Sequence, residues 1–266
     1  MKNEIYFKKP IKHIENIPVF SNVNSYIENY EKIATDHIEH FIKTGNNPFM
    51  EESYWKSVED STKLLIKKYA KPNDKILDVG VGMGRLLEDF KEMKRYGMDI
   101  SQGYLKIATK KGIDCCLSLI DDMPYEQEVF DVVICTDVLE HVLNLNASVS
   151  KILNVIKNGG ILIIRVPYKE DISWYLSEDC PYEFVHLRSF DEFVLKALFT
   201  KIFNTTILEW NTAGIIYDNS RLKFPIPPYN ILLSKLFQLY YKLKSKDRKK
   251  YTSFFNANEI NFVIRK

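Results

Sequence analysis

Glycines recur at alternate positions directly after a short apolar run that ends in an aspartate. They are Gly80, Gly82 and Gly84 in the run ILDVGVGMGRL. Such glycines let a backbone turn sharply and approach a ligand without an intervening Cβ atom. Asp99 comes 21 residues after Asp78, at the end of the next apolar run, where a carboxylate can accept hydrogen bonds from both hydroxyls of a ribose. The pattern predicts a site for a ribose-bearing cofactor. A tight turn with a helix-capping aspartate is the alternative.

His141 ends the run Asp137-x-x-Glu140-His141, which follows a strongly β-forming segment. On a helix this spacing places three ligand-type side chains on one face, and carboxylates favour Mg²⁺. We therefore expect Asp137, Glu140 and His141 to form a metal site. The alternative is a capping box of Asp137 and Glu140, with His141 packed in the core.

His186 is the second candidate for chemistry, in the segment Glu183-Phe-Val-His186-Leu-Arg188. The unperturbed pKa of histidine, about 6.5, suits it to take a proton from an acceptor hydroxyl. We expect His186, and His141 beside it, to act in catalysis. The alternative is a structural role, in which His186 fixes the start of the following helix and Ser189 is the N-cap of that helix.

The elements that must position these residues alternate between short apolar runs and segments with helical periodicity. Strands are predicted at 75–79, 96–100, 113–119, 129–136, 161–166, 204–217 and 258–264. Helices are predicted at 52–69, 85–93, 102–111, 147–157 and 189–202, the fourth closing on Asn158-Gly159-Gly160. Alternation of this kind indicates βαβ units on a parallel sheet. The expected fold class is α/β, a doubly wound Rossmann-like sheet.

The two ends of the chain depart from this alternation and predict additions to the sheet domain. We expect an N-terminal arm or cap at 1–60, a sheet domain at 61–217 and 254–266, and a helical insertion at 218–253. Within the insertion, residues 231–250 are first apolar and then basic. They could lie on an anionic membrane surface as a peripheral contact, or pack over the acceptor site.

Composition excludes several classes of function. The 266 residues carry a formal charge of +2, which argues against a nucleic acid as the main partner. The four cysteines have no disulfide or metal-type spacing, and no apolar run is long enough for a signal peptide or a membrane span. We expect a cytoplasmic protein that acts on a small molecule, with a peripheral membrane location as the alternative.

The glycine loop identifies a family resemblance. Dinucleotide enzymes use G-x-G-x-x-G, whereas Asp78-x-Gly80-x-Gly82-x-Gly84 resembles the loop of class I S-adenosylmethionine-dependent methyltransferases. FDVVICTDVLEHV and IKNGGILIIRVPY resemble the fourth strand, helix and fifth strand of that superfamily. The resemblance implies a seven-stranded sheet with an antiparallel last strand, and S-adenosylmethionine as cofactor.

The resemblance also implies which residues hold the cofactor. The glycines would line its methionine and ribose, Asp99 would hold the ribose, and the loop before Pro124 would embrace the adenine. In that loop Ile120 stands where the family usually has an aspartate, so Asp121 is the nearest acid. The implied cofactor residues are Asp78, Gly80, Gly82, Gly84, Asp99, Ile100, Ile120, Asp121, Asp122 and Thr136.

The expected activity is transfer of a methyl group to a sugar, lipid-linked or other biosynthetic acceptor. The histidines favour oxygen as the acceptor atom. The run ending in His141 resembles ubiquinone-pathway O-methyltransferases, where such residues hold a divalent metal, and members of the superfamily often carry a His-x-x-x-Phe run where His186 stands. The alternatives are an inactive nucleotide-binding scaffold or regulatory subunit and, less favoured, an NAD(P)-dependent oxidoreductase.

Overall fold

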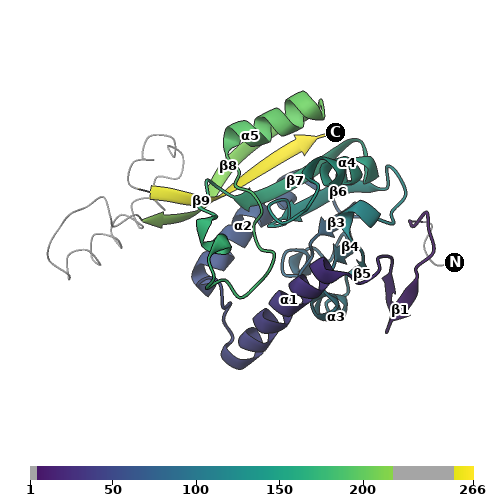
Figure 1. Ribbon diagram of the computed structural model, residues 1–266. Helices are drawn as coiled ribbons and strands as arrows, with labels where there is room; N and C mark the ends of the chain where they lie inside the picture. The colour runs from purple at the N-terminus through teal and green to yellow at the C-terminus, as the bar shows by residue number, and fades with distance from the viewer. Residues whose placement is uncertain (1–4, 218–254) are drawn as a thin grey trace.

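The computed structural model describes residues 5–217 and 255–266, whose strands form one sheet (Figure 1). The strand order is β1-β2-β5-β4-β3-β6-β7-β9-β8. The five strands from β5 to β7 run parallel, while β9 is antiparallel to both of its neighbours. Without the β1–β2 hairpin, this is the seven-stranded sheet that the resemblance implied. The α/β fold class is confirmed.

Short runs of Val, Ile and Leu form the central strands, because these strands are covered on both faces. The strands are β1 (Lys12–Ile14), β2 (Ile17–Val19), β3 (Lys75–Val79), β4 (Lys94–Asp99), β5 (Asp114–Leu117), β6 (Phe130–Thr136), β7 (Ile156–Pro167), β8 (Thr206–Tyr217) and β9 (Phe255–Arg265). The helices are α1 (Ser25–Thr44), α2 (Glu52–Tyr69), α3 (Gln102–Lys110), α4 (Leu145–Val155) and α5 (Glu192–Lys196).

Two hydrophobic cores lie on opposite faces of the sheet. Helices α4 and α5 pack on one face through side chains such as Ile152 and Leu195. Helices α2 and α3 pack on the other through side chains such as Ile66 and Leu105. Helix α1 contacts α3 and leaves the sheet faces to the other helices (Figure 1). Helix α1 is therefore free to contribute to a site beyond the ends of the strands.

Several local predictions are wrong. The predicted helix at 85–93 is only a 3₁₀ turn, Leu87–Asp89. Strand β7 begins directly after α4, so Gly159 lies in the strand and does not end the helix. Helix α5 is capped by Asp191, whose side chain accepts the first free N–H groups, and not by Ser189. Part of the predicted N-terminal arm joins the sheet as β1 and β2.

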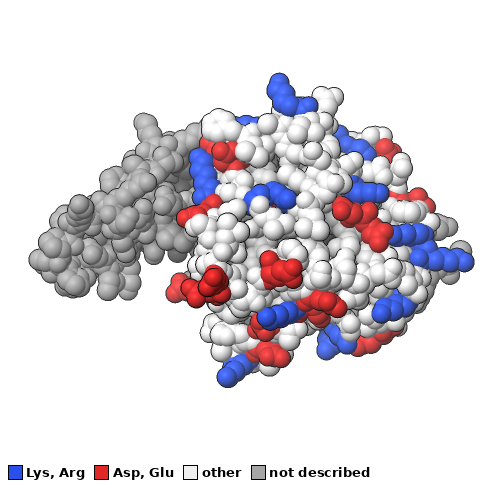
Figure 2. All heavy atoms as spheres, viewed as in Figure 1, with Lys and Arg blue, Asp and Glu red and all other residues white. Residues whose placement is uncertain are grey.

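The predicted insertion, including the segment 231–250, lies outside the described residues. Among the residues that the structure does describe, no helix is long and apolar enough to cross a membrane. On the face shown in Figure 2, acidic and basic side chains are interspersed and do not separate by sign.

Candidate functional site

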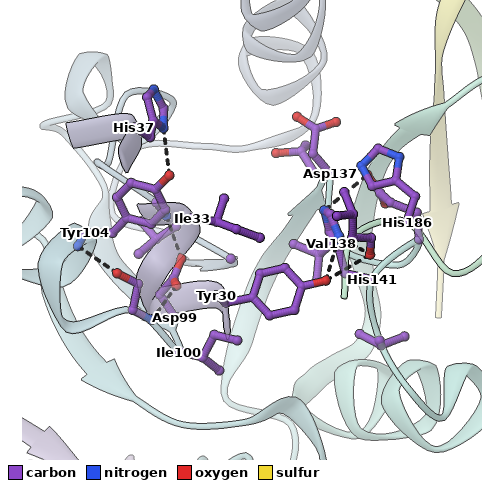
Figure 3. A pocket seen from close by; sticks show the side chains of 18 of the residues that line it. Tyr30, Ile33, His37, Asp99, Ile100, Tyr104, Asp137, Val138, His141 and His186 are labelled. Atoms are coloured by element: carbon purple, nitrogen blue, oxygen red, sulfur yellow. Dashed lines mark hydrogen bonds and ion pairs between the residues drawn. The ribbon is translucent and has the colours of Figure 1, made fainter. Parts of the chain in front are cut away.

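A cavity of about 720 Å³ opens beyond the carboxyl ends of β3, β4, β5 and β6, the edge where open α/β sheets bind their ligands. Figure 3 shows two groups of side chains on either side of it. Asp99, Ile100, Tyr104 and His37 form one side, and Asp137, Val138, His141 and His186 the other. Tyr30 of α1 projects between them. The cavity thus joins the predicted cofactor residues to the predicted catalytic residues.

The three glycines of the loop after β3 have different roles. All have positive φ, at +79° for Gly80, +51° for Gly82 and +75° for Gly84. A Cβ on Gly80 would lie 2.2 Å from Val138 Cγ2, and one on Gly84 would lie 2.7 Å from Ile113 Cδ1. A Cβ on Gly82 would meet nothing within 4 Å. Gly80 and Gly82 line the cavity, whereas Gly84 is absent from its lining and serves packing.

Asp99 is held in place by the loop that it faces. Its carboxylate accepts the N–H of Gly82 at 2.9 Å through one oxygen and the N–H of Ser101 at 2.9 Å through the other. Each carboxylate oxygen has a further lone pair, which is available to a ligand hydroxyl. Burial raises the pKa of Asp99, and the backbone donors oppose that rise.

Asp78 lies beneath the glycine loop and is 2% exposed. Its Oδ1 is buried without a hydrogen-bond partner among the described residues. Burial raises the pKa of this carboxyl well above its usual range. A buried carboxylate of this kind is stabilised by a positively charged donor, such as the amino group of a bound amino acid.

Four further predicted cofactor residues, Ile100 and three of the adenine loop, divide into two groups. Ile100, Ile120 and Asp121 line the cavity, and Asp121 accepts the hydroxyl of Ser148. Asp122 lies outside the lining, and its carboxylate is bound by Lys8 at 2.9 Å and Ser21 at 3.0 Å. Asp122 is therefore positioned to hold the N-terminal segment.

Two residues on the cofactor side were not predicted from the sequence. His37 of α1 lies 2.7 Å from the hydroxyl of Tyr104 of α3 through Nδ1 (Figure 3), and its Nε2 is buried without a partner among the described residues. Burial lowers the pKa of His37 to about 4. The i, i+3, i+4 spacing of α1 gave no sign of this role, because the contact spans 67 residues.

The end of β6 places Thr136 and Asp137 at the middle of the cavity. Asp137 has a φ of +55° and begins a loop, so the predicted helical face of Asp137, Glu140 and His141 does not form. The capping-box alternative is also wrong, because Asn144 caps α4. Both carboxylate oxygens of Asp137 pair with the buried guanidinium of Arg165 on β7. Asp137 therefore fixes this loop to the neighbouring strand.

Glu140 and His141 lie side by side on the far side of the cavity. Glu140 is fully buried, and neither carboxylate oxygen has a hydrogen-bond partner among the described residues. Burial raises its pKa well above the usual range. His141 Nδ1 lies 3.0 Å from the carbonyl oxygen of Val185, which can only accept, so Nδ1 carries the proton. Burial lowers the pKa of His141 to about 4, which leaves Nε2 as an unprotonated acceptor.

His186 is paired with an acid that the sequence did not single out. Its Nδ1 lies 2.5 Å from Oε2 of Glu170, and Tyr175 donates its hydroxyl to Oε1 of Glu170 at 2.8 Å. The rings of His186 and His141 meet edge-on, with centroids 4.6 Å apart. With Nδ1–H donated to a carboxylate, Nε2 of a neutral His186 is free to accept a proton. Glu170 lies three residues after the end of β7. This position just beyond a predicted strand is the one sequence signal that could have identified it.

Helix α1 fixes the loop that carries His186. Asn29 donates to the carbonyl of Phe184 at 2.7 Å and accepts the N–H of Glu183 at 2.9 Å. Tyr30 donates its hydroxyl to the carbonyl of Val185 at 3.0 Å. These contacts join residues about 155 positions apart, so His186 is placed by the N-terminal segment as well as by the sheet.

The predicted magnesium site does not fit these side chains. Arg165 donates hydrogen bonds to both carboxylate oxygens of Asp137. The potential metal ligands that lie close together are instead a carboxylate oxygen of Glu140 and one ring nitrogen each of His141 and His186. Mg²⁺ prefers oxygen ligands in octahedral geometry, and this set supplies two nitrogens. His141 Nε2 lies 3.9 Å from Glu140 Oε1, whereas neighbouring ligands of one small divalent ion lie about 3 Å apart.

Comparisons with known proteins find methyltransferases among the similar sequences and folds. The family model described as a methyltransferase domain matches residues 77–164. An uncharacterized protein of Methanocaldococcus jannaschii is 28% identical over 240 residues, which is 88% of this chain and 95% of that protein. A ubiquinone biosynthesis O-methyltransferase of Bradyrhizobium is 32% identical over 98 residues, 34% of this chain and 38% of the relative.

A solved structure shares the fold over most of both chains. It is a SAM-dependent methyltransferase of Thermotoga maritima, a possible histamine N-methyltransferase, with a TM-score of 0.56 at 15% identity. The match covers 90% of this chain and 99% of that one. At this identity the likeness concerns the fold.

Proposed function

Because the chain belongs to the class I S-adenosylmethionine-dependent methyltransferase superfamily, we propose that it methylates a hydroxyl oxygen of a small-molecule acceptor. The observation that carries the proposal is the pairing of Glu170 with His186, which lines the same cavity as Asp99 and Gly82. One cavity thus contains a ribose-binding carboxylate and an oriented proton acceptor.

The residues of the cofactor side fit S-adenosylmethionine. The open space at Gly82 admits the ligand against the backbone, Asp99 has lone pairs for the ribose hydroxyls, and the unpartnered oxygen of Asp78 suits a cationic amino group. When bound, S-adenosylmethionine supplies a sulfonium methyl group whose carbon–sulfur bond breaks as the new carbon–oxygen bond forms.

The chain itself contributes orientation and proton transfer. His186 Nε2 accepts the hydroxyl proton, and Glu170 stabilises the resulting imidazolium through Nδ1–H. The rings of Tyr30, Trp174 and Tyr175 line the same cavity and exclude water from the reacting atoms. Since the donor is already activated, holding the two reactants in line supplies much of the rate enhancement.

The test uses S-adenosylmethionine labelled with ¹³C in its methyl group and a small-molecule extract. We expect transfer to a low-molecular-weight product whose methyl carbon shift is that of an ether. His186→Ala should reduce turnover much more than affinity for S-adenosylhomocysteine. A labelled N-methyl or C-methyl product would refute oxygen as the acceptor, and equal losses of turnover and affinity would remove His186 from catalysis.

Binding of S-adenosylhomocysteine, the demethylated cofactor, tests which cofactor the chain binds. Calorimetric titration should show binding of S-adenosylhomocysteine and no comparable binding of NAD. Binding without any methyl transfer would instead support a scaffold role for the chain.

A further inference from the structure

We propose that the acceptor carries an ammonium group on the carbon next to its reacting hydroxyl, and that Glu140 and His141 bind this ammonium. The inference rests on the proposed function, since it places the hydroxyl at His186. It names the substrate class as vicinal amino alcohols.

Glu140 is the acid on this side of the cavity that lacks a partner of its own. Its side chain is fully buried, lines the cavity and has two oxygens without hydrogen-bond partners among the described residues. Asp137 is paired with Arg165, and Glu170 with His186. A fully buried carboxylate without a partner is strongly unfavourable. The site is therefore complete only with a ligand that brings positive charge or hydrogen-bond donors.

Among the described residues, Arg188 interacts electrostatically with Glu140, but its guanidinium is already engaged. Arg188 donates to the backbone carbonyls of Leu139 and Leu143, at 2.8 and 3.5 Å, and not to the carboxylate. His141 and His186 cannot replace it, because His141 is neutral and His186 donates to Glu170. Glu259 lies near Arg165, at 3.9 Å from its Nε. No described side chain donates a hydrogen bond to Glu140, so a cationic ligand would supply the counter-charge that keeps this carboxylate ionised.

The spacing of the free acceptor atoms suits an ammonium. A carboxylate oxygen of Glu140 and one nitrogen each of His141 and His186 lie within 4.8 Å of one another, and the first pair is 3.9 Å apart. Two acceptors at about 2.9 Å from one tetrahedral nitrogen are about 4.7 Å apart. Neighbouring ligands of a metal ion at about 2.1 Å are only about 3.0–3.4 Å apart. The 3.9 Å separation lies between these two values, so it accommodates a hydrogen-bonding ammonium, and the experiment below separates this cation from a coordinated ion.

The surroundings are aromatic, as is common where cations bind. The ring of Tyr30 lies 5.3 Å from that of His141, and the ring of Tyr175 lies 4.8 Å from that of His186. Because one nitrogen of His186 lies within 4.8 Å of the other two atoms, a hydroxyl and an ammonium on adjacent carbon atoms can reach His186 and Glu140 together. A nitrogen kept protonated has no free lone pair, so binding at Glu140 also directs the methyl group to oxygen.

The experiment compares two ligands of matched shape on the full chain saturated with S-adenosylhomocysteine. They are 2-amino-1-phenylethanol and its neutral counterpart 1-phenyl-1,2-ethanediol, each titrated by calorimetry near neutral pH. We expect the amine to bind at least tenfold more tightly to the wild type, and Glu140→Gln to bind the two alike. Glu39→Gln, at an exposed position of α1, should keep the preference. Equal binding of the two ligands by the wild type would overturn the inference.

Three controls distinguish the other outcomes of this experiment. Unchanged affinity of Glu140→Gln for S-adenosylhomocysteine shows that the variant is folded, and a preference that survives in this folded variant would overturn the inference. A stoichiometric metal ion in the wild type that is lost in Glu140→Gln, with the preference abolished by EDTA, would replace the ammonium site by a metal site. If the wild type transfers a methyl group to oxygen but does not prefer the amine over the diol, only this inference is wrong. If the wild type prefers the amine but transfers no methyl group, the proposed function is wrong.

Discussion

The carboxylate of Glu170 accepts a hydrogen bond from Nδ1 of His186 at 2.5 Å, while its other oxygen accepts the hydroxyl of Tyr175. Glu170 follows β7 and His186 lies in the loop before α5, so the contact joins two segments on one side of the cavity. The arrangement fixes one tautomer of His186 and leaves Nε2 toward the proton that must be removed.

Replacing Glu170 by Gln should lower kcat at least tenfold and leave KM and affinity for S-adenosylhomocysteine nearly unchanged. The neutral amide cannot stabilise the imidazolium that forms when His186 takes a proton. Steady-state kinetics and calorimetry measure the two effects separately. Tyr175→Phe, which keeps the carboxylate, should lose only a few-fold. Parallel losses in kcat and cofactor affinity would reduce Glu170 to a structural role.

Replacing Asp99 by Ala should weaken binding of S-adenosylhomocysteine at least tenfold. Hydrogen bonds to a charged acceptor contribute about 1.5–3 kcal/mol each, and the change also frees the N–H of Gly82. Asp122→Ala is the matched control, because Asp122 lies outside the cavity lining. If calorimetry gives the same affinity for wild type and Asp99→Ala, the ribose assignment is wrong.

Gly82 and Gly80 of the loop after β3 should respond differently to substitution, because only Gly82 faces open space. Gly82→Val should abolish binding of S-adenosylhomocysteine, since its side chain enters an open part of the cavity, at a stability cost of about 1–2 kcal/mol from the positive φ. Gly80→Ala should instead mainly destabilise the fold, by at least about 2 kcal/mol, because its Cβ would overlap Val138. Thermal unfolding and calorimetry distinguish the two losses. The reverse pattern would place the ligand against Gly80.

The cofactor half of the site was predictable from the sequence because its signals are local. The glycine run fixes a turn after β3, and Asp99 ends the next strand, so both meet at one edge of a parallel sheet. Glu170 and His37 were not predictable, because their roles depend on how a loop and helix α1 fold back over that edge. Asp137 shows a different failure. Its i, i+3, i+4 spacing to Glu140 and His141 suggests a helix, but its positive φ and its pairing with Arg165 produce a loop.

His37 should make stability depend on pH. Burial lowers its folded pKa to about 4, from about 6.5 in the unfolded chain. Below pH 6.5 the unfolded state binds more protons than the folded state, so protonation of His37 in the unfolded chain lowers the stability of the fold progressively as the pH falls from 6.5 toward 4. The shift corresponds to about 3 kcal/mol. Denaturant unfolding at pH 7 and pH 4 should therefore show a smaller loss for His37→Gln than for the wild type.

The matched control for this pH effect is His40→Gln, at an exposed position of the same helix. It should lose stability on acidification as the wild type does. Equal losses for His37→Gln and the wild type would show that His37 is not held neutral.

Removal of divalent metal should leave methyl transfer unchanged within twofold. Arg165 engages both oxygens of Asp137, so the carboxylate that would complete a magnesium site is not available. The same pairing predicts that Asp137→Asn lowers stability by about 1.5–3 kcal/mol, since it removes the nearer of the two carboxylates beside the buried guanidinium of Arg165. Activity after dialysis against EDTA, with and without added Mg²⁺, and thermal unfolding of the variant measure these effects. Activity lost to EDTA and restored by Mg²⁺ would show that Asp137 leaves Arg165 to coordinate an ion.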